Sequence, residues 1–348
     1  MNFRSSLVLV LFCSAWLCTA CEGWFKKSWN SDQTFSNAKL KEIKLNGFST
    51  EFTITYLDSA NQELKPDLDS LLEHISRAVD EQSPSSELSI FNMRDTLTNP
   101  SFEFLSWMRK AQKWHSESAG VIEFTDKPIQ DIWTFSNSGP KLKDSTDVNF
   151  YLRLTGFQRI TVSDSLIRKP DGTWLDFRKI NEGVILDRIG AFLESKGIKN
   201  FYIRTSTNEL SRGVNEKGEL WKSRVSYLAD SAEQILAGLI ALDNKAVSSW
   251  GNEKEYFLRD SLKIGFTLDP RTGYPVNHGL LQAVVVSESA ETSSALVNQL
   301  SVSGRSAAFR LDSLNKGVYF MLIYHEKGGT LQQFISPELK PYLSFPVK

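Results

Sequence analysis

The sequence is poor in residues that cross-link chains. Only three of its 348 residues are cysteines. Cys13, Cys18 and Cys21 all lie at the N-terminus, so the rest of the chain has no thiol for a disulfide framework or a thiolate zinc site. A chain of this length buries enough surface to form a large core without disulfides. An exported protein with no other thiol also avoids unwanted oxidation.

Histidine residues are also few, and the net charge is small. His74, His115, His278 and His325 are scattered without metal-ligand spacing, so surface or packing roles are predicted for them. The formal net charge is −1, which argues against nucleic acid as a partner. The 41% hydrophobic and 23% charged content is typical of a globular protein.

The N-terminal apolar run, 7–17, is too short for a transmembrane helix, which needs about 20 residues. It follows Arg4 and is typical of a secretory signal. The next four residues, 18–21, resemble a bacterial lipobox with Cys21 as the lipidated residue, although Cys18 stands where leucine is usual. Ordinary secretion with cleavage near Ala20 is the alternative.

These features predict three parts: a lipoprotein signal peptide at 1–20, a polar tether at 21–37 and one folded domain at 38–348. The mature protein is then expected in a bacterial cell envelope, anchored to the membrane by lipid and facing outside the cytoplasm.

The folded part mixes strands and helices without a clean linker, which predicts a single large α+β domain. The expected strands are 48–56, 201–204, 281–286 and 318–324, with short strands in 149–176 and a hairpin formed by 239–242 and 246–249. The expected helices begin at Pro66 and after Pro100, the second with Phe102 facing inward, and include 183–196 and 293–302. The stretch 136–147 is expected to be a surface loop.

The most informative stretch is Gly-Phe-Thr-Leu-Asp-Pro-Arg-Thr-Gly-Tyr-Pro at 265–275. Its pattern predicts a strand that ends in an Asp-Pro turn, because Pro270 fixes φ and Gly273 permits a positive φ. On its own such a turn is usually only a tight connection. It becomes informative because four other segments precede it in a particular order.

Those segments carry short patterns of polar and small residues. They are Ser-Glu-Leu-Ser-Ile-Phe-Asn at 86–92, Pro-Ile-Gln-Asp-Ile-Trp-Thr-Phe at 128–135, Leu-Asp-Phe-Arg-Lys-Ile-Asn-Glu-Gly-Val-Ile-Leu-Asp at 175–187, and Thr-Ser-Thr-Asn at 205–208. Flanking the fifth segment, Ala-Val-Ser-Ser-Trp-Gly-Asn at 246–252 and Ser-Ser-Ala-Leu-Val-Asn at 293–298 complete the set. Together, in this order, they resemble the ApbE family of flavin transferases over about 48–304.

This resemblance implies an ApbE-like, T-fold-type architecture of mixed sheets with packed helices. It also implies transfer of FMN from FAD to a Thr or Ser of an envelope protein, with Mg²⁺. By family position, the residues expected to bind the cofactor are Glu87, Asn92, Glu123, Asp176, Glu182, Asp187, Asp269 and Thr272. Ser294 and Asn298 stand where the family has metal ligands. No residue is assigned as catalytic.

Several positions depart from the family pattern. Arg178 and Lys179 replace a pair of small residues, Glu182 replaces a lysine and Phe266 replaces a histidine. Two neutral side chains are poor substitutes for ligands of Mg²⁺, which prefers carboxylate oxygens, and Glu182 near a pyrophosphate would repel it. The alternatives are therefore an inactive flavin-binding lipoprotein or a pseudoenzyme that acts as an assembly partner.

Overall fold

The computed structural model describes residues 38–136, 138–143, 147–228, 234–251, 256–259, 262–314, 316–326 and 331–344. These belong to one folded unit, Ala38–Lys348. The predicted signal peptide, Cys21 and the tether lie outside the described residues. Among the described helices, none combines the length and the apolar character needed to cross a bilayer.

The centre of the unit is an eight-stranded sheet in the order β1-β2-β8-β9-β12-β17-β18-β19, in which every neighbouring pair is antiparallel. Its strands are β1 (Lys39–Gly47), β2 (Thr50–Asp58), β8 (Phe201–Arg204), β9 (Asn208–Arg212), β12 (Ala246–Gly251), β17 (Leu280–Ser287), β18 (Tyr319–His325) and β19 (Leu331–Ile335). The predicted strands 201–204, 281–286 and 318–324 are confirmed. Phe48, expected at the start of a strand, instead forms a two-residue turn with Ser49, both at positive φ, between β1 and β2.

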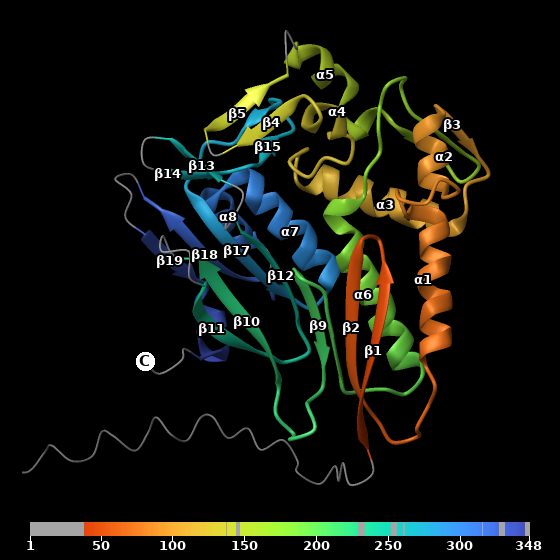
Figure 1. The fold of residues 1–348 in the computed structure, drawn as a ribbon, viewed down its shortest axis with the longest axis vertical. Coiled ribbons are helices and arrows are strands. Elements are labelled where there is room, and N and C mark those ends of the chain that lie inside the picture. The colour runs from red at the N-terminus through yellow and green to blue at the C-terminus, as the bar shows by residue number, and fades with distance from the viewer. Residues whose placement is uncertain are drawn as a thin grey trace, which may run out of the picture. The chain divides into compact units, whose positions relative to one another are not determined.

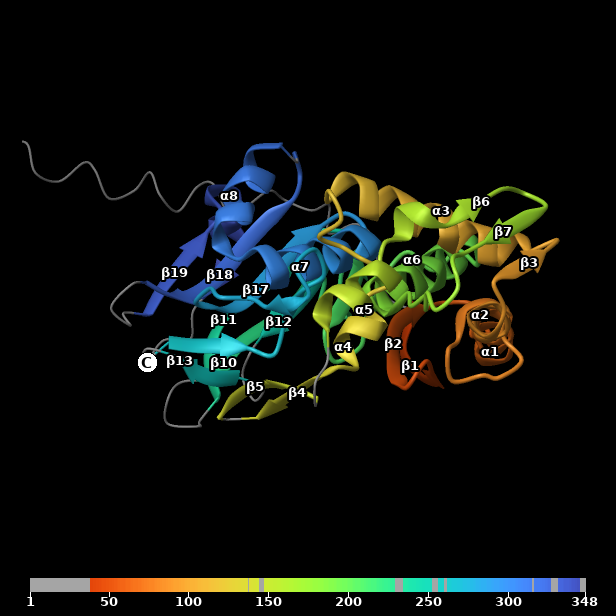
Figure 2. The same cartoon turned by 90° about the horizontal axis from the view of Figure 1, so that it is seen from above.

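Helices cover one face of this sheet, where α1 (Lys65–Val79), α6 (Arg178–Ser195), α7 (Ala290–Ser303) and α8 (Arg305–Leu314) contact it. The other helices are α2 (Glu87–Met93), α3 (Phe102–Glu117), α4 (Lys127–Gln130) and α5 (Val148–Leu154), with 3₁₀ turns at Phe157–Arg159 and Pro337–Tyr342. Figures 1 and 2 show α6 between α1 and α7, and α6 contacts both. Because α6 is surrounded, it is buried on nearly every side, and the main core forms between these helices and the sheet.

A second, smaller sheet packs on the opposite face. It contains β10 (Trp221–Leu228), β11 (Gln234–Leu242) and β20 (Leu343–Ser344). Its apolar side chains form a separate core with those of β12, β17 and β18. The expected hairpin of 239–242 with 246–249 is therefore wrong: β11 pairs within the small sheet, whereas β12 pairs with β9 and β17 in the large one.

Short strand pairs complete the fold. They are β3 (Thr96–Thr98) with β7 (Leu166–Arg168) and β6 (Thr161–Val162), β4 (Trp133–Ser136) with β5 (Gly139–Leu142), β13 (Tyr256–Arg259) with β14 (Leu262–Gly265), and β15 (Leu268–Asp269) with β16 (Tyr274–Pro275). The β4–β5 pair lies partly where a surface loop was expected, so that expectation is wrong. In 149–176, β6 and β7 confirm the expected short strands, whereas α5 was not expected there.

The first two expected helices both form, and only the second differs from its prediction. α1 begins at Lys65, with Pro66 in its first turn, as predicted. In α3, Ser101 caps the N-terminus by accepting a hydrogen bond from the amide of Phe104. That start leaves Phe102 79% exposed, so its predicted inward position is wrong, while Phe104 and Trp107 are fully buried instead.

Candidate functional site

Several of the segments singled out by sequence contact α6 or the residues that lead into it. The first of these contacts joins Asn92 to Leu175, which lies 83 positions further along the chain. The amide of Asn92 donates to the carbonyl of Leu175 at 2.8 Å and accepts from its N–H at 2.7 Å. Asn92 thus pairs with the backbone as a strand would, and it fixes the chain just before Asp176 and the start of α6.

Glu123 ties a loop together through one carboxylate oxygen. Its Oε1 accepts from the amides of Phe124, Thr125 and Phe157 at 2.9 to 3.0 Å and from the hydroxyl of Thr125 at 2.6 Å. Its Oε2 lies 3.3 Å from Nδ1 of His115, and the residue is only 4% exposed. These contacts hold the loop that faces the start of α6 in a fixed conformation.

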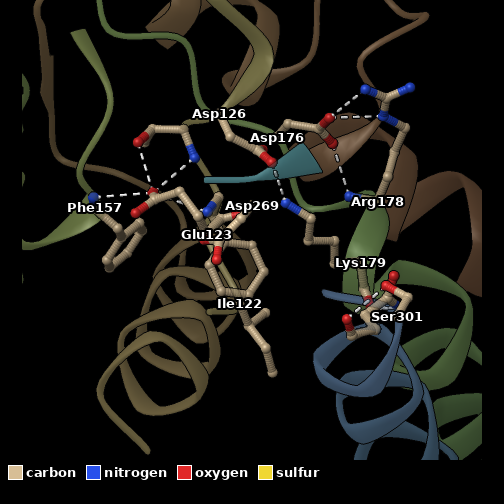
Figure 3. Close-up of polar contacts among 12 residues, drawn as sticks. Ile122, Glu123, Asp126, Phe157, Asp176, Arg178, Lys179, Asp269 and Ser301 are labelled. Atoms are coloured by element: carbon tan, nitrogen blue, oxygen red, sulfur yellow. Dashed lines mark hydrogen bonds and ion pairs between the residues drawn. The ribbon is translucent and has the colours of Figure 1, made fainter. Parts of the chain in front are cut away.

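Two cations occupy the first turn of α6, and both pair with carboxylates, Lys179 with Asp126 and Arg178 with Asp176 and, at 3.6 Å, Glu81 (Figure 3). Lys179 Nζ lies 2.6 Å from Asp126 Oδ2 and donates to the carbonyl of Glu123 at 2.6 Å. Arg178 donates from Nε and Nη2 to Asp176 at 2.6 Å, and its amide also bonds Asp176. The Asp176 carboxylate raises the pKa of the Arg178 guanidinium, so that charge is permanent. Positive charge at a helix N-terminus is unfavourable alone, and these acidic partners offset it.

Glu182, one turn further along α6, points to the central sheet. Its Oε1 accepts from the hydroxyl of Thr50 at 3.0 Å. Its Oε2 accepts from the hydroxyls of Thr205 and Thr207 and from the Asn208 amide at 2.6 to 3.2 Å. The turn at 205–208 therefore supplies the donors that neutral polar residues can give to a carboxylate. This arrangement satisfies the negative charge that replaces the lysine of the family pattern.

Asp187 joins α6 to the N-terminus of α7. Its carboxylate accepts from the amides of Ala290 and Glu291 at 2.8 and 3.0 Å and from the hydroxyl of Ser289 at 2.7 Å. Burial raises the pKa of Asp187, and these hydrogen bonds partly offset that rise. A carboxylate placed beside the N-terminus of another helix, here α7, also suits that helix's dipole.

Ser294 and Asn298, expected at the metal position, lie on α7 and meet the backbone of α6. Ser294 Oγ donates to the carbonyl of Lys179 at 3.1 Å, and Asn298 Nδ2 donates to the same carbonyl at 3.0 Å. Asn298 Nδ2 also donates to the carbonyl of Ser294 at 2.9 Å. Because both partners of Nδ2 are carbonyl oxygens, the amide nitrogen and not the amide oxygen faces the junction.

This donor set does not fit Mg²⁺. The ion is usually held by one or two carboxylates in octahedral geometry, whereas the junction offers a hydroxyl, a carbonyl and an amide nitrogen. The nearby carboxylates of Asp126 and Asp176 are already paired with Lys179 and Arg178. Among the described residues, no group of three or more His, Cys, Asp or Glu is arranged to hold a metal ion.

The turn at 265–275 forms as the sequence predicts. The amide of Gly273, at φ 75°, donates to the carbonyl of Asp269 at 2.8 Å, and the amide of Thr272 donates to the same carbonyl. Arg271 donates to the Asp269 carboxylate from its side chain and its amide. Burial raises the pKa of Asp269, but the Arg271 contacts outweigh it and hold that pKa below its ordinary value.

The same turn is anchored to other predicted segments. Trp133 Nε1 donates to the carbonyl of Gly273 at 2.8 Å, and β15 contacts α7. Phe266, which stands where the family pattern has a histidine, stacks on Phe135 with ring centroids 5.0 Å apart. A phenylalanine ring has no proton to transfer, so this position contributes packing only.

The structure therefore gathers most, but not all, of the predicted site residues. Asn92, Glu123, Asp176 and the Ser294–Asn298 pair lie around the start of α6. Glu87 is elsewhere: it sits in α2, where it accepts from the amide of Ser101 at the start of α3. The assignments as cofactor-binding residues stay predictions.

Asp126 is the residue that the sequence argument missed. It directly precedes the Lys-Pro start of α4, and an acidic residue there is usually interpreted as a helix cap. The structure shows no side-chain cap, and the carboxylate instead pairs with Lys179, 53 positions away. No local signal in the sequence reports that pairing.

Comparison with known proteins agrees with this geometry. The model of the ApbE family matches residues 48–322, so the chain belongs to the ApbE family. Two curated relatives are named FAD:protein FMN transferase. The protein of Vibrio cholerae serotype O1 is 24% identical over 87% of this chain and 93% of its own length, and that of Haemophilus influenzae is 22% identical over 83% and 88%.

Solved structures agree on the fold. Flavin transferase ApbE from Vibrio cholerae superposes with a TM-score of 0.75 at 22% identity, over 88% of this chain and 99% of that one. Flavinyl transferase ApbE from Pseudomonas stutzeri, in its apo form, gives a TM-score of 0.76 at 20% identity, over 89% and 98%. The predicted α+β, ApbE-like fold is confirmed.

Proposed function

We propose that this protein is an FAD:protein FMN transferase. In that reaction a Thr or Ser hydroxyl of an acceptor protein attacks the FMN phosphorus of FAD. A phosphodiester bond forms between FMN and the acceptor, the pyrophosphate bond breaks, AMP leaves, and the hydroxyl proton passes to a base. No residue of this chain is assigned as that base.

The observation that carries the proposal is the meeting of several of the family's segments at α6. Asn92 holds Leu175, just before α6, and the loop of Glu123 and Asp126 holds Lys179. The 205–208 turn binds Glu182, and α7 contacts both Lys179 and Asp187. These contacts join positions between 23 and 119 residues apart. Segments that match a family in order and also meet at one helix support a shared site rather than a shared core alone.

The cations at the start of α6 support a phosphate ligand. Arg178 and Lys179 lie beside a helix N-terminus, whose dipole favours an anion, and a bound phosphate would share them with Asp176 and Asp126. Trp133, Phe135 and Phe266 lie around the neighbouring turn and offer aromatic surface. The named relatives all carry transferase names, and nothing in them supports an inactive assembly protein.

We also propose that the protein acts in the cell envelope, anchored through Cys21. The support is the N-terminal sequence alone, with its Arg4, short apolar run and Ala-Cys pair. Metabolic labelling with a radioactive fatty acid, with Cys21→Ala as the control variant, tests this. Equal labelling of both proteins, or none of either, rejects the anchor.

The transferase assay uses the full chain, FAD and exported flavoproteins of the same organism as acceptors. The expected result is flavin fluorescence that stays on the acceptor after acid precipitation, together with release of AMP in equal amount. Replacing the acceptor Thr or Ser with Ala must remove the fluorescence. No covalent flavin and no AMP, with acceptors that a known relative does modify, would reject the proposal.

A further inference from the structure

The junction between α6 and α7 differs from a metal site in a way that can be tested. A metal site brings lone pairs together, and the cation removes their mutual repulsion. Here the Lys179 carbonyl receives two hydrogen bonds, from Ser294 Oγ and Asn298 Nδ2, so donors face an acceptor. The junction is complete without a cation because each contact already pairs a proton with a lone pair.

Packing around the junction reinforces this conclusion. A Cβ added to Gly183 on α6 would lie 2.4 Å from the carbonyl oxygen of Ala290 and 2.8 Å from Cβ of Ser294. The two helices therefore touch through their backbones at this level, and Ser294 is only 4% exposed. Mg²⁺ usually keeps several of its waters when bound, and these would have to fit beside such a contact.

The protein itself supplies a positive charge next to the α6–α7 junction. Lys179 contributes its backbone carbonyl to the junction. Its side-chain ammonium group contacts the Asp126 carboxylate and the Glu123 carbonyl. An ammonium group has three N–H donors, and these two contacts use two of them. The Lys179 side chain is 20% exposed, and one of its three N–H donors takes part in neither of these contacts.

A dication would also compete with cations that are already in place. The carboxylates beside the start of α6, which are Asp126, Asp176 and Glu81, face Lys179 or Arg178 and are not free to serve as metal ligands. An anion would not compete with these cations. A phosphate oxygen accepting from the ammonium would form a charge-assisted hydrogen bond, which is about twice as strong as a neutral one.

We propose that this chain binds the pyrophosphate of its flavin dinucleotide without a divalent metal, with the Lys179 ammonium supplying the positive charge. The inference depends on the proposed function, since it concerns the same site and the same ligand. It differs from the family expectation of Mg²⁺, because it assigns the positive charge to a side chain that replaces a small residue.

The first test measures affinity for FAD by isothermal titration with the full chain, once with EDTA and once with excess Mg²⁺. We expect dissociation constants that agree within about threefold. Affinity that rises tenfold or more with Mg²⁺ would overturn the inference and leave the proposed function intact. Absence of FAD binding in both buffers would overturn the proposed function and the role of Lys179 together.

The second test uses the metal alone. Mn²⁺, a paramagnetic substitute for Mg²⁺, should show no stoichiometric binding to the native chain by electron paramagnetic resonance. The double variant Ser294→Asp with Asn298→Thr restores the family residues and should bind about one Mn²⁺. One tightly bound Mn²⁺ per native chain would overturn the inference whether or not FAD binds.

The third test addresses the lysine. Lys179→Met removes the charge and should weaken FAD binding in EDTA by about 10- to 100-fold, which is the usual effect of one hydrogen bond to a charged group. Lys127→Met is the matched control, because Lys127 pairs with Asp131 on the surface of α4, and it should change affinity less than twofold. Lys179→Arg retains the charge and should recover most of the binding. Unchanged affinity in a folded Lys179→Met protein would overturn the assignment.

Discussion

The two halves of α6 use charged side chains in opposite ways. In its first turn, Arg178 and Lys179 depart from the family pattern, and their partners Asp176 and Asp126 come from loops. Two turns later Asp187 matches the pattern, and its partners are backbone amides of α7. The matching residue thus holds two helices together, whereas the departures pair with side chains of loops.

This difference suggests that architecture and ligand chemistry are separable in this chain. Asp187 and Gly183 determine how closely α6 and α7 pack, whatever the ligand is. The residues at 178, 179 and 182 set the charge presented by the same helix, and their partners are side chains and loops outside the α6–α7 contact. Each prediction below tests one side of this comparison.

The largest effect is expected at Asp187. Asp187→Ala leaves the amides of Ala290 and Glu291 and the hydroxyl of Ser289 without their acceptor, so we expect a loss of about 3 kcal/mol in the free energy of unfolding. Denaturant titration measures it. The surface carboxylate Asp67, paired with Lys196, provides the control: Asp67→Ala should cost less than about 0.5 kcal/mol. Equal effects in the two variants would contradict the structural role of Asp187.

Close helix contact gives the next effect. Gly183→Ala would force a Cβ against the backbone of Ala290, and we expect a cost of about 2 kcal/mol in unfolding free energy. Gly190→Ala, on the same helix, meets the Cδ2 of Leu210 at 2.9 Å, which is a side-chain tip that can move. It should therefore cost less. If Gly190→Ala proves the more destabilising variant, then α6 and α7 are not in backbone contact at Gly183.

The same comparison shows what the sequence could and could not predict. Strands such as 281–286 are continuous apolar runs between turn signals, and their prediction needed no tertiary information. The pairing of β11 could not be predicted, because apolar periodicity does not say whether two successive strands share a sheet or face each other across a core. The β4–β5 pair was missed for a related reason: Trp133 and Phe135 are ordered by Gly273 and Phe266, more than 130 positions away.

The prediction of the site also succeeded where it depended on sequence position and failed where it depended on tertiary contacts. Family position indicated which residues to examine, and the structure places several of them around one helix start. Their partners were not predictable from local patterns, because Asp126, Thr50 and the Ala290 amide are ordinary residues that become important only when the helices pack. The effect of Glu182 illustrates this: an expected repulsive charge has four donors around it.

Glu182 should therefore tolerate neutralisation. Glu182→Gln keeps one acceptor oxygen, and the hydroxyls of Thr50 and Thr205 can rotate to accept from the new amide, so we expect a cost of about 1 kcal/mol in unfolding free energy. The exposed Glu194 on the same helix is the control, and Glu194→Gln should change stability by less than about 0.5 kcal/mol. A cost above that of Asp187→Ala would mean that the first half of α6 depends on charge for its architecture, and the comparison above would fail.

The smallest effect is expected in the turn at 265–275, where a salt bridge stabilises a local conformation. The Arg271 contacts hold the pKa of Asp269 below its ordinary value of 3.8, so the carboxylate contributes stability above that value and loses it as the pH falls through the lowered pKa. Because Arg271 is about half exposed, solvent screens the pair and the change should be confined to the turn. Nuclear magnetic resonance of the Gly273 amide, which donates to the Asp269 carbonyl, should follow a single titration below pH 3.8 in the native chain. Asp269→Asn should remove this titration while leaving the amide signals of α6 and α7 unchanged, and a titration that persists in the variant would assign it to another group.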